Sequence, residues 1–219
     1  MLKSINWRYA IGEIIIVIIG ITIAFTLNKY AENAKHAIDK QKYLESLIGD
    51  LDNEMLHLNN NTEKFQQKIA DIKGLFPYLN GKMDGRDTIV GKVFGLAEII
   101  HFQPNDITYK TLINSGDLGL FDNFELKKEL ENHYSDQTLI EMDYKRQNNI
   151  HEKYFGDFMI HHIDFDQVRK GNYSFIDDKL LKNIIQSLYG TYMIAITTSE
   201  KGVERCQKLK EVLEEEVKN

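Results

Sequence analysis

The feature that most constrains this fold is a heptad pattern that begins inside an apolar segment and continues far beyond it. Gaps of about four and three residues alternate between Glu13 and Phe76. The positions are Glu13, Ile16, Gly20, Ile23, Leu27, Tyr30, Ala34, Ala37, Gln41, Leu44, Ile48, Leu51, Met55, Leu58, Thr62, Phe65, Ile69, Ile72 and Phe76. This spacing keeps one stripe of a helix facing a partner for roughly nine heptads. It predicts a long helix that passes from lipid into water.

Composition restricts the class of protein further. The chain has 219 residues, a net charge of -6, two prolines and one cysteine. A nucleic-acid-binding surface needs a basic face, and the sequence contains no Lys/Arg cluster. Scarce proline and helical spacing in the polar stretches argue against disorder and against a β-sandwich. We expect an all-α chain with one extramembrane domain.

The apolar segment predicts a membrane anchor over residues 9–27, close to the roughly 20 residues that a helical span needs. Its end, from Ala24 to Asn28, offers no small-x-small cleavage site, which favours an uncleaved anchor over a signal peptide. Lys3 and Arg8 precede it and several lysines follow it, so charge alone does not decide the orientation. We expect residues 1–8 as a short cytoplasmic tail and residues 28–219 as a helical-bundle domain outside the cytoplasm.

Three residues in the predicted span favour association with another helix. Gly20 and Ala24 form a small-xxx-small pair that lets a helix approach closely. Glu13 lies near one interface, where a carboxylate can reach the headgroups or pair with a cation such as Arg8. A proton-coupled role for Glu13 is the alternative, although such a group is expected nearer the bilayer centre.

Two blocks of the sequence resemble a known family. The run from Tyr9 to Ile14, followed by Gly20-Ile21 and Ala24, looks like the N-terminus of uncharacterised single-span proteins of the Bacteroidetes group. The run from Tyr109 to Leu118 is similar to the central Tyr-x-x-Leu-x-x-Ser-Gly-x-Leu pattern of that family. The resemblance implies no activity. It implies a bacterial inner-membrane anchor with its C-terminal domain in the periplasm.

Periodicity and turn residues predict an antiparallel bundle of three long helices and two short ones. The first long helix continues from the span to Phe76, where Pro77 is expected to end it. Short helices are expected over residues 89–100 and 106–113, and long ones over 123–160 and 177–212. The distal part of the first helix is expected to pack on later helices of its own chain.

The last helix carries a second regular stripe of apolar and small residues. Its positions are Leu181, Ile185, Leu188, Tyr192, Ala195, Ser199, Gly202, Cys206, Leu209 and Leu213. Small residues on a packed stripe let helices come close. We therefore interpret Cys206 as a buried thiol and not as a nucleophile.

Two further segments contain residue types that bind ligands elsewhere. Ser115, Gly116 and Asp117 form a turn that is interpreted first as a tight connector and alternatively as a contact for an anion or a partner. Residues 161–166 contain two histidines and two aspartates, but adjacent histidines point apart. We interpret this segment as a polar helix end and predict no catalytic, cofactor-binding or metal-ligating residue.

These features favour a membrane-anchored, non-enzymatic bundle that acts as an oligomeric scaffold or accessory subunit of a cell-envelope complex. Its expected partners are membrane lipid, further copies of the chain or other envelope proteins, and not nucleic acid. A periplasmic module that binds or senses a small ligand is the alternative. A metal-dependent enzyme using residues 161–166 is the third.

Overall fold

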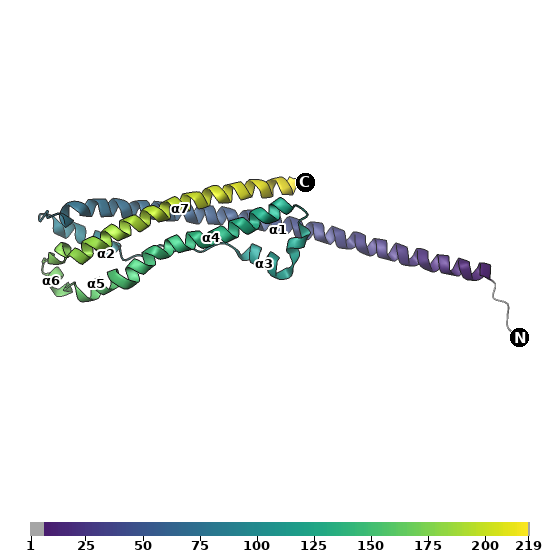
Figure 1. Ribbon diagram of the computed structural model, residues 1–219, viewed down its shortest axis with the longest axis horizontal. Helices are drawn as coiled ribbons and strands as arrows, with labels where there is room; N and C mark the ends of the chain where they lie inside the picture. The colour runs from purple at the N-terminus through teal and green to yellow at the C-terminus, as the bar shows by residue number, and fades with distance from the viewer. Residues whose placement is uncertain (1–6, 219) are drawn as a thin grey trace.

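The computed structural model describes residues 7–218, with side chains from residue 11 onward, and it contains helices and no strands in that range. The predicted all-α class is confirmed. Figure 1 shows a bundle from which the N-terminal part of one helix projects far beyond the rest of the chain. Most of the predicted tail, residues 1–6, and the side chain of Arg8 lie outside the described part.

The projecting helix is α1, which extends without interruption over Trp7–Leu79. Its side chains from residue 14 to residue 38 are exposed, and the first fully buried one is Leu44. Pro77 does not end the helix at Phe76 as predicted, because it lies in the last turn, where a missing N–H costs at most one helical hydrogen bond. The helix ends three residues beyond Phe76. The predicted continuity of the apolar segment and the first long helix is confirmed.

A short helical segment and an extended one return the chain to the start of the bundle. The 3-10 turn η1 (Arg86–Ile89) leads into α2 (Val90–Gly95). Residues 96–106, here called the strap, are not helical, so the helix expected over 89–100 ends early. In Figure 1 the strap crosses from the α2 end of the bundle to α3 (Ile107–Ser115). The 3-10 turn η2 (Asp117–Leu120) follows.

The second long helix of the bundle contains a π-helical turn. It consists of α4 (Phe124–Ile150), the π turn η3 (His151–Phe155) and α5 (Gly156–His161). Asn123 caps α4, because its side chain accepts a hydrogen bond from the N–H of Leu126 at 3.1 Å. The short helix α6 (Phe165–Arg169) and the turn η4 (Ser174–Asp177) lead into α7 (Lys179–Lys218).

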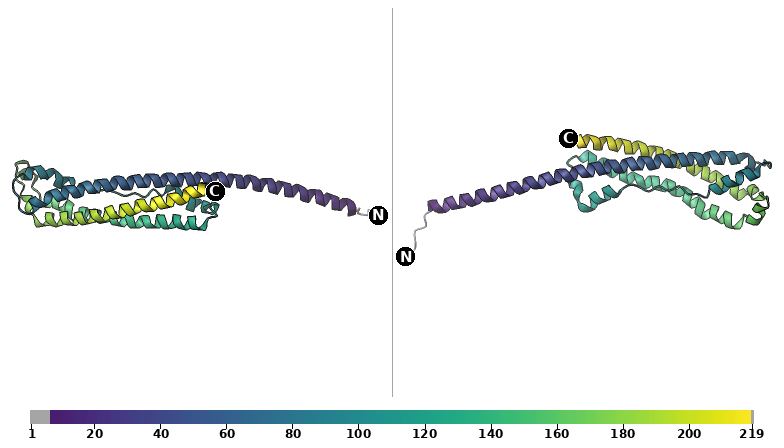
Figure 2. Two further views of the ribbon diagram at one scale, coloured as in Figure 1. Left: turned by 90° about the horizontal axis from the view of Figure 1, so that it is seen from above. Right: turned by 180° about the vertical axis from the view of Figure 1, so that it is seen from behind.

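The core lies between α1, α4 and α7. Figure 2 shows α7 beside the distal part of α1 in both views, with the C-terminus near the point where α1 leaves the bundle. Every residue of the predicted α7 stripe is buried, including Cys206. At Gly202 a Cβ atom would lie 2.9 Å from a methyl of Leu58 and 3.0 Å from one of Ile140. The small residues of α7 therefore allow the close packing that the sequence predicted.

The buried stripe of α1 differs from the predicted one by one residue at alternate positions. Leu44, Leu51, Leu58, Phe65 and Ile72 are buried as expected. The intervening core positions, however, are Leu47, Glu54, Asn61, Lys68 and Leu75, and not Ile48, Met55, Thr62, Ile69 and Phe76, of which only Ile69 is also buried. The apolar pattern missed this register because three of the true core positions carry polar side chains.

Candidate functional site

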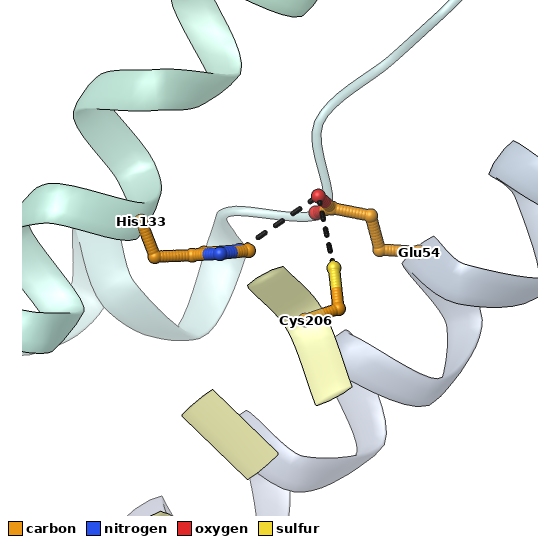
Figure 3. Close-up of side chains that lie close together, drawn as sticks. All are labelled: Glu54, His133 and Cys206. Atoms are coloured by element: carbon orange, nitrogen blue, oxygen red, sulfur yellow. Dashed lines mark hydrogen bonds and ion pairs between the residues drawn. The ribbon is translucent and has the colours of Figure 1, made fainter. Parts of the chain in front are cut away.

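One group of three potential ligand side chains lies in the core of the bundle. Glu54 of α1, His133 of α4 and Cys206 of α7 offer a carboxylate oxygen, a ring nitrogen and a sulfur that all lie within 4.8 Å of one another. Figure 3 shows that dashed lines join the Glu54 carboxylate to both other side chains. Glu54 Oε1 lies 3.5 Å from Cys206 Sγ and 3.7 Å from His133 Nε2. Each residue comes from a different helix of the core.

Burial sets the protonation of all three groups. Glu54, His133 and Cys206 are 2%, 7% and 0% exposed. Burial raises the pKa of Glu54 to about 7, although hydrogen bonds from Cys206, the Asn105 backbone and Gln137 oppose the rise. Burial lowers the pKa of His133 to about 4. Burial and the nearby Glu54 charge raise the pKa of Cys206. His133 is therefore neutral at pH 7, and its contact with Glu54 is not an ion pair.

Two more residues of α4 complete the surroundings of the cluster. The Gln137 amide donates to Glu54 Oε2, and its nitrogen lies 3.4 Å from His133 Nε2. Because both amide protons are donors, Nε2 of neutral His133 acts as the acceptor, with its lone pair toward the cluster. The hydroxyl of buried Tyr134 has no hydrogen-bond partner. Burial raises the pKa of Tyr134, as do the charges of Asp50, Glu54 and Cys206.

Three further buried polar side chains hold the strap and the residue before it. On the α1 side, Asn61 donates to the carbonyl of His101 at 2.9 Å, and Lys68 donates to the carbonyl of Gly95 at 2.9 Å. On the α4 side, Gln147 donates to the carbonyl of Ile100 at 2.6 Å and accepts from its N–H at 3.4 Å. These contacts replace the hydrogen bonds that a helix or sheet would supply to the strap backbone.

Comparison with known protein families identifies the family of this chain. Residues 13–154 match the family of unknown function DUF6090, and this range is more than half of the 219 residues. The chain belongs to the DUF6090 family. The expectation of an uncharacterised family is confirmed, whereas the bacterial group and the membrane location stay predictions. No curated protein and no solved structure matches the chain.

The DUF6090 match begins at Glu13, in the apolar part of α1. This helix is, by length and composition, the one in the described range that could cross a membrane. Glu13, Gly20 and Ala24 are exposed, and nothing lies within 4 Å of a Cβ atom placed on Gly20. Spacings of seven and four residues put these residues on one face of the helix. Their predicted role in helix association stays a prediction.

The turn predicted as a connector or contact site in this DUF6090 chain makes contact with α1. The Asp117 carboxylate accepts hydrogen bonds from the hydroxyls of Tyr43 at 2.6 Å and Ser115 at 2.7 Å. The bond from Tyr43 and then the bond from Ser115 hold the pKa of Asp117 below its ordinary value. Gly116 supplies the left-handed conformation at φ 79° that ends α3. A partner or anion contact at Ser115, Gly116 and Asp117 stays a prediction.

The histidines and aspartates of residues 161–166 lie at the opposite end of the DUF6090 bundle from the α3 turn. His162 Nδ1 lies 2.9 Å from the Asp178 carboxylate, and His161 Nε2 lies 3.6 Å from Asp157. Asp164 caps α6 by accepting from the N–H groups of Asp166 and Gln167. These contacts agree with the interpretation of the segment as a polar helix end.

Sequence reasoning missed the Glu54–His133–Cys206 cluster in this DUF6090 chain. The sequence pattern places Cys206 on a core stripe, but it does not include Glu54 among the core positions of the first helix and does not pair His133 with either residue. Counting heptads from Leu51 and Leu58 with polar residues allowed would have placed Glu54 in the core. No spacing rule reveals that residues 54, 133 and 206 meet, because three separate helices bring them together.

Proposed function

We propose that this DUF6090 protein is a single-span membrane protein whose bundle acts, without catalysis, as an oligomeric scaffold or accessory subunit of a cell-envelope complex. The proposal includes an N-terminus in the cytoplasm and a bundle in the periplasm. The observation that carries it is the continuity of α1, which bears an exposed apolar segment at one end and the central core stripe of the bundle at the other.

The exposed apolar segment supports the membrane part of the proposal. Ten large apolar side chains between Ile11 and Phe25 are at least half exposed: Ile11, Ile14, Ile15, Ile16, Val17, Ile18, Ile19, Ile21, Ile23 and Phe25. Water disfavours such a surface at about 25 cal/mol per Å², so the segment requires lipid or a partner. A helical span also satisfies its own backbone groups.

The exposed stretch that follows supports a rigid mechanical link. About 17 residues separate Leu27 from Leu44, or roughly 25 Å at about 1.5 Å per residue. Figures 1 and 2 show this stretch as helix that leaves the bundle without a break. Since no flexible linker intervenes in α1, the orientation of the span and that of the bundle are coupled, as a scaffold requires.

The test is the mass and composition of the full-length protein, purified from membranes in mild detergent. Light scattering combined with mass spectrometry should find a defined homo-oligomer or a stoichiometric partner. Gly20→Leu with Ala24→Leu should disrupt that assembly, because both fill the approach surface of the helix. Thr22→Leu is the matched control, because residue 22 lies on the opposite side of the helix.

Two outcomes would contradict the scaffold proposal. A monomer without a co-purifying chain would favour the alternative, a periplasmic module that binds a small ligand. An assembly that is equally sensitive to Thr22→Leu would show that the face formed by Glu13, Gly20 and Ala24 is not the contact surface.

A further inference from the structure

We propose that Glu54, His133 and Cys206 bind one zinc-type divalent transition metal ion between α1, α4 and α7. The site goes beyond the proposed scaffold role and does not depend on it. The three side chains supply carboxylate oxygen, imidazole nitrogen and thiolate sulfur, the ligand set that zinc uses in proteins. A thiolate ligand argues against magnesium and calcium, which prefer oxygen alone.

The spacing of the ligand atoms suits a tetrahedral ion. With about 2.0 Å from zinc to oxygen and about 2.3 Å to sulfur, tetrahedral angles separate the two ligand atoms by about 3.5 Å. Glu54 Oε1 and Cys206 Sγ are 3.5 Å apart. The same geometry requires about 3.3 Å between oxygen and nitrogen, and Glu54 Oε1 lies 3.7 Å from His133 Nε2. A shift of a few tenths of an ångström at His133 would bring its Nε2 to this distance from the Glu54 oxygen, and all three ligand atoms lie within 4.8 Å of one another.

The charges also balance inside the core. A divalent cation bound to one carboxylate, one thiolate and one neutral imidazole forms a site with no net charge. Burial favours such compensation, because an unpaired charge in the core is expensive. Nε2 of His133 is the unprotonated ring nitrogen, since Gln137 is positioned to donate to it, and a bound ion would replace that hydrogen bond. His133 therefore needs no change of tautomer to bind a metal ion.

The residue that follows His133 carries a buried polar group without a partner. The buried hydroxyl of Tyr134 makes no hydrogen bond, although buried polar groups are almost always satisfied. Tyr134 follows His133 on α4, and its ring packs edge-on against the imidazole at 5.0 Å between centroids. Tyr134 and Cys206 belong to the same buried cluster of side chains.

The decisive experiment uses Co²⁺ as a spectroscopic substitute for Zn²⁺. The full-length protein in detergent is treated with chelator, exchanged into buffer and titrated with Co²⁺ alone. We expect one ion per chain and the near-ultraviolet absorption of a cobalt–thiolate bond. Because Cys206 is the only cysteine, that absorption can arise only from this site. Added Zn²⁺ should abolish the absorption by displacement.

Variants identify the ligands. Cys206→Ser should abolish the thiolate absorption, and Glu54→Gln or His133→Gln should weaken binding at least about tenfold, since even outer-shell partners contribute that much. The double variant His161→Gln and His162→Gln is the matched control and should bind one ion with unchanged absorption. Circular dichroism without metal checks that each variant retains its helices.

The absence of thiolate absorption in the unmodified protein would overturn the proposal and leave the cluster as a hydrogen-bonded polar core. If only the double variant His161→Gln and His162→Gln loses stoichiometric binding, the metal site proposal is likewise overturned. The ion would then bind at the surface. If a core variant fails to fold, the titration of the unmodified protein decides the question by itself.

Discussion

Polar side chains in the core of this protein face specific partners. Lys68 is 6% exposed, and its ammonium group reaches the carbonyl of Gly95 and the exposed carboxylate of Glu98. Gln147 is 1% exposed and uses both of its amide atoms on Ile100. An unsatisfied buried group costs about 1–3 kcal/mol, so these pairings are what make the polar positions tolerable. They also specify how the chain packs.

Glu54 and His133 should carry opposite pH dependences of stability in the metal-free protein. The pKa of Glu54 is raised to about 7, so the free energy of unfolding should fall as pH rises from about 4.5 to 7. The pKa of His133 is lowered to about 4, so the free energy should rise between about pH 4 and 6.5. The two contributions, each on the order of 3 kcal/mol, nearly cancel in the unmodified chain.

Single substitutions should therefore reveal each dependence. Relative to the unmodified protein, His133→Asn should lose stability as pH rises from 4.5 to 7, and Glu54→Gln should gain it. Urea unfolding followed by circular dichroism, at several pH values and with chelator present, measures both differences. Curves that run parallel to that of the unmodified protein would show that neither group has a shifted pKa.

The strap shows how an extended element can be held inside a helical protein. Its backbone contacts Asn61 of α1 on one side, and Gln147 of α4 and His151 of η3 on the other. Lys68 of α1 donates to the adjoining carbonyl of Gly95 at the end of α2. Ile100 and Phe102 of the strap are buried in the same core. The strap is thus a fourth component of the bundle, although it has no regular secondary structure.

Loss of the Gln147 amide should release the strap. Gln147→Met keeps the length of the side chain but leaves the N–H and carbonyl of Ile100 without partners, so we expect a loss of about 3 kcal/mol. Gln67→Met, at an exposed position of α1, is the control and should change stability by less than about 0.5 kcal/mol. Hydrogen exchange of the Ile100 amide should accelerate only in Gln147→Met. Equal effects of the two substitutions would contradict this role.

Alanine substitutions at two glycines of α7 should separate the effect of close packing on stability from the effect of helix propensity. Ala favours a helix over Gly by about 1 kcal/mol. Gly190→Ala meets nothing within 4 Å and should be stabilising by that amount. Gly202→Ala meets buried methyls of Leu58 and Ile140 near 3 Å, and overpacking of about 1–3 kcal/mol should make it the less stable variant by roughly 2 kcal/mol. Denaturant midpoints compare the two, and equal midpoints would mean that the core adapts without cost.

At the scale of the whole molecule, α1 has two parts with different surroundings. The first part is exposed to its surroundings. None of its described side chains before residue 44 is buried against the rest of the described chain. Its second part forms the core with α7 and α4. The bundle should therefore not need the first part in order to fold.

Residues 36–219 alone should form a helical protein that is soluble without detergent. Its thermal unfolding midpoint should lie within a few degrees of that of the full-length chain in detergent, because residues 11–35, the removed part whose side chains the structure describes, bury nothing in the bundle. Circular dichroism and light scattering measure both properties. Aggregation, or a much lower midpoint, would show that the exposed part of α1 contributes to folding through contacts between copies.

The sequence predicted the elements of this fold better than their contacts. The α7 stripe could be predicted completely because its core positions are apolar or small, so periodicity alone identifies them. The α1 stripe was predicted correctly only at alternate positions, because Glu54, Asn61 and Lys68 look like surface residues. Residues 96–100 were predicted to be helical, since Ile100 continues a helical spacing that packing against α1 and α4 overrides.

The sequence by itself determined the helical class, the apolar segment of α1 and the small, buried face of α7, because helical periodicity and apolar content are local properties of the chain. Only the tertiary structure decided the core register of α1, the extended strap and the meeting of Glu54, His133 and Cys206. The physical reason is that a buried polar group is stable only beside its partner, and these partners lie far away in the sequence.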